Sequence, residues 1–358
     1  MRRFGVEEEL LLVAADSGAP VALADVVVSQ EADETPESEL KRQQVEMATA
    51  PCSTRAELAA DLRTRRQSAA TAARRKGVAV AALGTSPLAA SPSVMPGARY
   101  QWMAREYALT AEEQLTCGCH VHVSVASARE GVAVLDRIRP WLAPLLALSA
   151  NSPFWQGRDS GYASYRHQVW GRWPSSGPTE VFGTTENYRG TVQAMIESGA
   201  LLDEGMIYFD ARLSSKHPTV EIRVADICLY ADDAVLLALL VRALVDTAAR
   251  AWRAGEPPQS VRTELLRLAS WRASRTGLDG DLVHPVTARP VPADVVIGAL
   301  LEHLSPALAD TGDLAAATEL LGRLLRRGNG ATRQRRVHAE TGDLAEVVRA
   351  AVSATLDT

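Results

Sequence analysis

The sequence predicts an α+β fold in one domain that spans residues 1–358. Residues 219–226 alternate apolar and polar side chains, as a strand with one buried face does, and residues 207–213 repeat this alternation. Residues 231–358 read mostly as helices, and no linker rich in Pro, Gly or Ser separates them from the preceding part. We therefore expect the helical last third to pack on a sheet formed by the rest of the chain.

Composition and charge exclude several classes of protein. The chain has 358 residues, of which 47% are hydrophobic, so it can bury a substantial core. A net charge of −5 argues against a nucleic-acid partner, and no apolar run reaches transmembrane length. Acids at positions 7–9 stand where a signal peptide has an apolar run, so we expect a cytoplasmic protein with reduced cysteines. Lysine is nearly absent, so anion binding must fall to arginine.

Two predicted strands near the N-terminus carry acids. Residues 4–13 alternate so that Glu7 and Glu9 share one face, roughly 7 Å apart along a strand. An acidic stretch that we expect to be a loop ends at Glu39 and leads into residues 44–49, a short strand with Glu46 on its polar face. The alternative interpretation of Glu7 and Glu9 alone is an exposed, acidic end of a strand.

A long scaffold helix is expected next. Ser53 or Thr54 can cap it, Glu57 supports a capping box, and Gly77 ends it. A buried strand at 78–83 and a helix at 100–115 follow.

The segment 117–125 places two cysteines and two histidines close together. In a strand, Cys117 and Cys119 face one way while His120 and His122 face the other, so these four side chains cannot close a zinc tetrahedron. We therefore predict no structural zinc and interpret the thiols as small core residues. The two imidazoles, which face the same way, have either a structural role or a role at a metal or phosphate site.

A helix is expected at 126–150, before a segment at 151–188 that is rich in Gly, Pro, Trp, Tyr and Arg. Long irregular segments inside a compact domain are usually lids or binding walls, and aromatic planes with interleaved Arg suit a small carboxylate. The alternative, a disordered insertion, fits poorly with the aromatic content. A helix at 186–199 follows.

The two alternating strands each show an acid and a base on one face. Asp210 and Arg212 share the polar face of 207–213, and Glu221 and Arg223 share that of 219–226. These strands indicate a sheet floor lined with charge. These two strands alone fit a solvated face with cross-strand ion pairs as well as they fit a functional floor.

The ordered set of motifs resembles the glutamate–cysteine ligase type 2 family, the carboxylate–amine ligases of the glutamine synthetase superfamily. Each motif is weak alone, but together they run in the family's order from residue 4 to about residue 336. They are Gly5-Val6-Glu7-Glu8-Glu9, Gln44-Val45-Glu46 followed by Thr49, Gly118-Cys119-His120-Val121-His122-Val123, Ser149-Ala150-Asn151-Ser152-Pro153, Val220-Glu221-Ile222-Arg223-Val224-Ala225-Asp226 and Trp271-Arg272-Ala273-Ser274-Arg275. Two places depart from the family pattern: Cys119, where a polar residue such as Gln is expected, and Tyr208-Phe209-Asp210, where Trp often precedes the Asp.

The resemblance implies an antiparallel sheet curved into a funnel, with ATP at one end, amino-acid-like substrates at the other and Mg²⁺ or Mn²⁺ between them. It also implies an ADP-forming carbon–nitrogen ligase that joins a small, glutamate-like carboxylate to an amine or amino acid through an acyl phosphate, with glutamate–cysteine ligation as one case. By motif, the metal ligands would be Glu7, Glu9, Glu39, Glu46, His120 and Glu221. The catalytic residues would be Glu46, Glu221 and Arg223. Substrate or nucleotide contacts would come from His122, Arg166, Asp210, Arg212, Arg223, Arg272 and Arg275.

Electrostatics favours a metal site independently of the resemblance. Four carboxylates within about 5 Å of each other would repel by roughly 3 kcal/mol per pair at an effective dielectric constant of 20, so they need cations or protons. Carboxylate oxygens with one imidazole suit Mg²⁺ or Mn²⁺. The rival interpretations are a metal-dependent hydrolase or deamidase on the same scaffold and a catalytically silent binding protein. We expect no membrane partner, and the sequence allows a homodimer.

Overall fold

The computed structural model describes residues 1–28, 37–38 and 40–357, and its main sheet is antiparallel throughout this part of the chain. Seven strands form it, in the order β2-β3-β1-β5-β9-β8 with β4 paired to β1. They are β1 (Phe4–Ala14), β2 (Glu37–Ser38), β3 (Gln44–Ala48), β4 (Val78–Ala81), β5 (Gly118–Ser124), β8 (Ala211–Leu213) and β9 (Thr219–Asp226). Two separate hairpins are β6 (Phe154–Trp155) with β7 (Arg158–Asp159) and β10 (Asp281–Val283) with β11 (Pro290–Pro292).

Helices make up most of the remaining chain. Those before β9 are α1 (Ala24–Val28), α2 (Arg55–Arg74), α3 (Ala98–Tyr107), α4 (Leu109–Glu113), α5 (Ala128–Ile138), α6 (Leu142–Ser149), α7 (Tyr165–Trp170) and α8 (Thr185–Glu197), with short 3₁₀ turns η1 (Arg139–Trp141) and η2 (Glu204–Met206). Those after β9 are α9 (Ala231–Arg253), α10 (Thr263–Thr276), α11 (Ala293–Asp310), α12 (Leu314–Arg327), α13 (Gly330–Thr341) and α14 (Leu344–Thr355).

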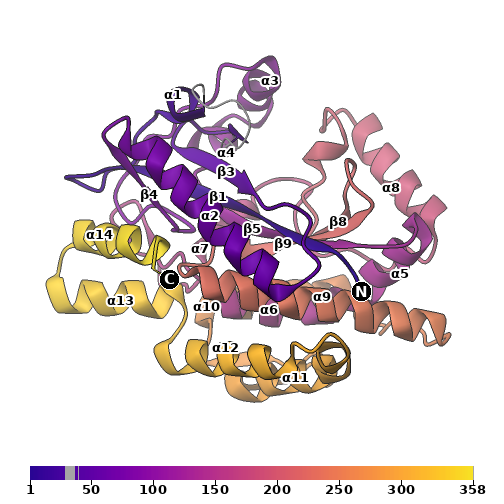
Figure 1. Ribbon diagram of the computed structural model, residues 1–358. Coiled ribbons are helices and arrows are strands. Elements are labelled where there is room, and N and C mark those ends of the chain that lie inside the picture. The colour runs from indigo at the N-terminus through magenta and orange to yellow at the C-terminus, as the bar shows by residue number, and fades with distance from the viewer. Residues whose placement is uncertain (29–36, 39, 358) are drawn as a thin grey trace.

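Helices α2, α5, α6 and α9 cover one face of the sheet, and α11 and α12 lie on the far side of α9 (Figure 1). Helix α9 is apolar over most of its circumference, because it is buried between the sheet and these outer helices. The last third of the chain therefore packs on the sheet, and the predicted α+β class is confirmed.

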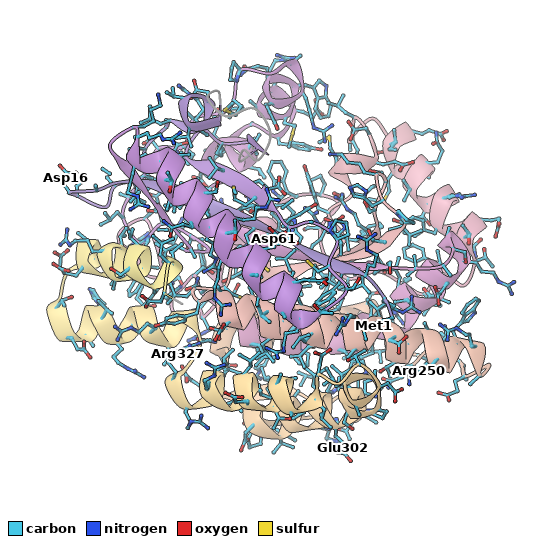
Figure 2. All side chains as sticks on the ribbon, viewed as in Figure 1. Met1, Asp16, Asp61, Arg250, Glu302 and Arg327 are labelled. Atoms are coloured by element: carbon cyan, nitrogen blue, oxygen red, sulfur yellow. The ribbon has the colours of Figure 1, made fainter. Side chains whose placement is uncertain are left out.

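Strand β1 lies in the middle of the sheet and runs from near Met1 toward the turn that contains Asp16 (Figure 2). Phe4 and Val6 are buried against the helices, since alternate residues of a strand face opposite sides. The odd-numbered acids Glu7 and Glu9 consequently face the side of the sheet that the helices leave open.

Several elements differ from the sequence prediction. The helix expected at 100–115 is broken at Ala108, which has a φ of 45° and separates α3 from α4. The helix expected at 126–150 is interrupted by η1, where Pro140 has no N–H to donate. Of the strand expected at 207–213, only Ala211–Leu213 joins the main sheet, and Phe209 forms a single bridge with Gly177. The segment 151–188 is not wholly irregular, because it contains the β6–β7 hairpin and α7.

No helix in the described residues is both long enough and apolar enough to cross a membrane.

Candidate active site

The open side of the sheet forms the floor of a cavity of about 1090 Å³. Side chains from β1, β3, β5, β8 and β9 line it, and α3 and the end of α7 contribute walls. Acids and histidines predominate on the floor, whereas Trp170, Trp173 and Tyr208 form an aromatic wall. The cavity thus combines a charged floor with an apolar side.

Strand register brings six predicted acids and histidines to this floor, beside the predicted Arg212 and Arg223. Glu7 lies opposite His120, and Glu9 lies opposite Glu46. Directly opposed residues of antiparallel strands point to the same face of a sheet. The six residues are Glu7, Glu9, Glu46, His120, His122 and Glu221, and all of them line the cavity.

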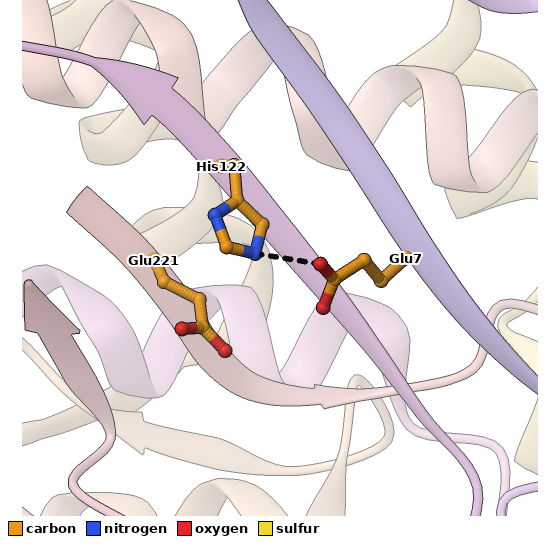
Figure 3. A group of neighbouring side chains, drawn as sticks. All are labelled: Glu7, His122 and Glu221. Carbon is orange, nitrogen blue, oxygen red and sulfur yellow. Dashed lines mark ion pairs between the residues drawn. The ribbon is translucent and has the colours of Figure 1, made fainter. Parts of the chain in front are cut away.

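Glu7 is the centre of this cluster. Its Oε1 lies 3.2 Å from His122 Nε2, and its Oε2 lies 3.7 Å from His120 Nδ1. Figure 3 shows the first of these contacts, with Glu221 on the far side of the His122 ring. Two groups of atoms lie within 4.8 Å of one another and could each hold an ion: one from Glu7, His122 and Glu221, the other from Glu7, Glu46 and His120. This donor set of carboxylate oxygens and imidazole nitrogens fits Mg²⁺ or Mn²⁺.

Two guanidinium groups hold Glu221. Arg212 donates from Nε to Oε2 at 2.8 Å and from Nη2 to Oε1 at 3.3 Å, and Arg223 donates from Nη1 to Oε1. Arg223 also lies over the ring of Trp170, 5.6 Å from its centroid. The β8–β9 edge of the cavity therefore carries fixed positive charge next to the acids.

The charges of the cluster shift its pKa values. Burial raises the pKa of Glu221, but Arg223 and Arg212 outweigh it and hold that pKa well below its ordinary value. At Glu7, burial raises the pKa, but the contacts with His120 and His122 outweigh burial and lower the pKa. Burial and the Arg223 charge lower the pKa of His120 to about 4, so its imidazole is neutral near pH 7 and has a lone pair to offer. Burial lowers the pKa of His122, but Glu7 outweighs it and raises that pKa.

Arg166 and Asp210 lie behind the cavity wall and do not line it. Arg166 packs on Gly118: a β-carbon there would stand 2.3 Å from its Nη2, so only glycine leaves room for the guanidinium. Arg166 also lies over Trp170, 5.4 Å from the ring centroid. Burial raises the pKa of Asp210 to about 7, although the charges of Arg267 and Arg166 oppose the shift.

The remaining predicted residues lie elsewhere. Arg272 and Arg275 belong to α10, where Arg275 donates to Gly161 O and lies over Tyr162, and neither lines the cavity. Glu39 falls outside the described residues.

The cavity residues that were not predicted as site residues include Lys41, Gln114 and Trp173. Burial lowers the pKa of Lys41 to about 8. One signal in the sequence could have drawn attention to Lys41, because the chain has only three lysines. Gln114 and Trp173 lie outside strands, so no alternation pattern indicated their direction.

Comparison with known proteins identifies the family. The model of the glutamate–cysteine ligase family 2 matches residues 3–350. The chain belongs to this family. Its relatives include a putative glutamate–cysteine ligase 2-1 of Streptomyces avermitilis, 56% identical over 360 aligned positions, and a putative glutamate–cysteine ligase 2 of Streptomyces coelicolor, 54% identical over 360. Each alignment covers 99% of both chains.

Solved structures agree on the fold. The glutamate–cysteine ligase of Francisella tularensis, solved in complex with AMP, has a TM-score of 0.71 at 12% identity and covers 100% of this chain and 89% of its own. A bifunctional glutathione synthetase of Pasteurella multocida has a TM-score of 0.70 at 15% identity and covers 99% of this chain and 52% of its own. The predicted glutamine-synthetase-type fold is confirmed, and family membership makes the protein an ATP-dependent carbon–nitrogen ligase that forms amide bonds.

Proposed function

We propose that the protein joins a small, glutamate-like carboxylate to an amine or amino acid, with ATP converted to ADP and phosphate. The observation that carries this proposal is the floor of the cavity, where a cluster of carboxylates and imidazoles lies beside Arg212 and Arg223. The relatives are named as putative glutamate–cysteine ligases, so glutamate and cysteine are the first substrates to test.

Metal binding is the first role of the cluster. Glu7, Glu9, Glu46, His120 and Glu221 would hold Mg²⁺ or Mn²⁺, and Glu39 is a further proposed ligand. When bound, the metal neutralises charge on the phosphates of the nucleotide. His122 also contacts Glu7, and this contact keeps that carboxylate oriented.

Activation of the carboxylate is the second step. A carboxylate mixed with an amine gives only a salt, so the oxygen must first become part of a leaving group. We assign Arg223 and Arg212 to the transferring phosphoryl group, since planar guanidinium groups donate paired hydrogen bonds to phosphate oxygens. A substrate carboxylate oxygen attacks the γ-phosphorus, the bond to the bridging oxygen breaks and ADP leaves, which produces an acyl phosphate.

Amide formation completes the reaction. The amine nitrogen attacks the acyl carbon, the carbon–oxygen bond to phosphate breaks, and the nitrogen loses a proton. Glu46 stands on β3, and two strands, β1 and β5, separate it from Arg223 on β9, so it faces the cluster from the side opposite the arginines. We therefore assign Glu46 as the acceptor of that proton. Arg166 and Asp210 act from behind the wall, where they position Trp170 and the backbone of Arg223.

ADP release is the deciding measurement. Purified protein with ATP, Mg²⁺ and a panel of amino acids and amines should release ADP and phosphate and form an amide in equal amounts. AMP and pyrophosphate as products would contradict the acyl-phosphate route. Amide hydrolysis that proceeds without nucleotide would instead favour a metal-dependent hydrolase or deamidase on the same scaffold.

A further inference from the structure

One corner of the cavity is built from buried polar side chains that the proposed chemistry does not use. It lies beyond Gly118, before the start of β5. We call it the Gln114 corner, and each of its members is at most 4% exposed. Its members are Lys41, Gln44, Gln114, Thr116 and Trp173, and all five line the cavity.

Three consecutive residues at the end of α4 hold this corner together. The carbonyl oxygen of Glu112 accepts a hydrogen bond from Lys41 Nζ at 3.0 Å. The Glu113 carboxylate pairs with Arg172 at 2.6 Å, which fixes the residue next to Trp173. Gln114 donates from Nε2 to the Thr116 hydroxyl at 2.5 Å. Segments that are far apart in the sequence therefore meet at residues 112–114.

The corner contains hydrogen-bonding capacity that the described residues leave unused. Gln114 Oε1 is a buried acceptor without a donor, and Trp173 Nε1 is a buried donor without an acceptor. Among the described residues, the ammonium group of Lys41 makes one hydrogen bond, to the backbone oxygen of Glu112, and no ion pair. Buried polar groups are nearly always paired in folded proteins, and an unpaired buried charge costs still more free energy. These atoms therefore indicate a ligand.

We propose that Lys41, Gln114 and Trp173 bind the α-amino and α-carboxylate groups of the carboxylate substrate, an inference that rests on the proposed function. Lys41 and Trp173 donate to the α-carboxylate, and Gln114 Oε1 accepts from the α-ammonium group. The nitrogen of the amine substrate must reach the reacting carbon beside the metal cluster. A nitrogen held in the Gln114 corner is thus a non-reacting one, which belongs to an amino-dicarboxylic acid of the glutamate type.

An adenine base is the rival occupant, since its edge also offers one donor and one acceptor. The ammonium group of Lys41 favours the amino acid, because adenine is neutral and a carboxylate matches the buried charge.

The test compares L-glutamate with two analogues that each lack one recognised group: 4-aminobutyrate has no α-carboxylate, and glutarate has no amino group. Binding to the full-length protein is measured by calorimetry, and the KM values for L-glutamate and ATP are measured by ADP release. Lys41→Met should raise the KM for L-glutamate about 10-fold or more and should remove the preference for L-glutamate over 4-aminobutyrate. The KM for ATP should change by less than about 2-fold.

Trp173→Phe keeps an aromatic ring and removes the N–H, so it should fold as the wild type does and raise the KM for L-glutamate by roughly 5-fold. Gln114→Leu should remove the preference for L-glutamate over glutarate. Lys76→Met, a lysine substitution outside the cavity, is the matched control and should leave every value unchanged.

The outcomes separate the two proposals. A larger rise in the KM for ATP than in that for L-glutamate in the corner variants would assign the corner to the nucleotide and overturn this inference alone. Unchanged KM values in an active enzyme would also overturn it. A wild-type protein that releases no ADP with L-glutamate and any amine of the panel would overturn the glutamate-type function and this inference together.

Discussion

Glu8 and Arg66 form a buried, bidentate ion pair on the face of β1 opposite to the acid cluster. Arg66 donates from Nε to Glu8 Oε2 at 2.8 Å and from Nη2 to Oε1 at 2.6 Å, and both side chains are 2% exposed. The remaining N–H groups of Arg66 donate to backbone oxygens of Cys228, Leu229 and Thr355. One side chain on α2 thereby joins β1, the segment after β9 and the end of α14.

This pair helps to fix which way β1 faces. Glu8 stands between Glu7 and Glu9, and a rotation of the strand that moved Glu8 off Arg66 would also turn both neighbours away from the cavity. The ion pair therefore belongs to the architecture of the site although it contacts no cavity residue on the open face.

Glu8→Gln should destabilise the protein by about 3–5 kcal/mol, because it leaves the buried guanidinium of Arg66 without its counter-charge. Thermal unfolding measures the loss. Glu264→Gln provides the control, since the Arg262–Glu264 pair is on the surface and its loss should leave the melting temperature unchanged. Equal melting temperatures for Glu8→Gln and the wild type would contradict the structural role assigned to the pair.

Glu221→Gln should weaken Mg²⁺-dependent turnover at every metal concentration, and least at the highest, because it keeps the shape of the side chain and removes the charge that attracts the ion. The measurement is ADP release across a magnesium titration. A variant that keeps wild-type turnover at low magnesium would show that Glu221 is not a metal ligand.

Arg223→Lys should reduce turnover by about 10²-fold and leave the magnesium dependence nearly intact, because an ammonium group cannot reproduce the paired donors of a guanidinium. A purely structural ion pair with Glu221 makes a different prediction. Glu221→Gln and Arg223→Lys would then both have lower melting temperatures and keep most of their activity per folded molecule. Melting temperature and turnover, measured on both variants, distinguish the two cases.

Chelation should abolish ADP release without unfolding the protein, since the acids of the cluster line the cavity while the core beneath the sheet is built from apolar side chains. Addition of Mg²⁺ or Mn²⁺ should restore activity.

Elemental analysis of untagged protein should find no stoichiometric zinc. In the structure Cys117 and Cys119 are buried in the core clusters while His120 and His122 line the cavity. Zinc at one equivalent per chain would refute this assignment.

Glu130 should make stability depend on pH in the acid range. Burial raises its pKa, but hydrogen bonds from Arg2, the backbone of Ala126 and Arg253 outweigh burial and lower the pKa from 4.5 to about 2. A pKa that is lower in the folded state adds stability above the unfolded value, and this stability is lost as the pH falls from about 4.5 toward 2. The melting temperatures of wild type and Glu130→Gln should therefore converge in this range. A gap that widens on acidification would contradict the linkage.

Sequence patterns predicted elements whose signals are local. Thr54 caps α2 and forms the predicted capping box with Glu57. Breaks caused by single backbone conformations were not predictable, because Ala108 has good helix propensity and still separates α3 from α4. The sequence predicted helices over most of residues 231–358, but no local signal indicated the contact by which Gln334 of α13 donates to the buried Asn151.

Alternation along the strands predicted the acids and histidines of the cavity floor. Alternation could not predict how deeply a side chain is buried. Arg166 and Asp210 were expected to contact substrate or nucleotide, yet packing on Gly118 and burial beside Arg267 keep both behind the wall. The direction of side chains in loops was equally unpredictable. The positions of Gln114 and Trp173 in the cavity follow only from the fold, which brings segments distant in the sequence together.

The pairing of β5 with β9 is irregular between Cys119 and Val121. Cys119 pairs with Ala225 and Val121 with Ile222, so a step of two residues on β5 faces a step of three on β9. The additional residue changes the parity of β9. Asp226 stands five positions after Glu221, so strict alternation would put the two acids on opposite faces, yet Asp226 pairs with Gly118 and bonds to the hydroxyls of Ser152 and Ser164. Removal of one residue at Val224 would regularise the ladder and rotate one of these acids into the apolar layer, so insertions and deletions at this point are incompatible with an intact floor.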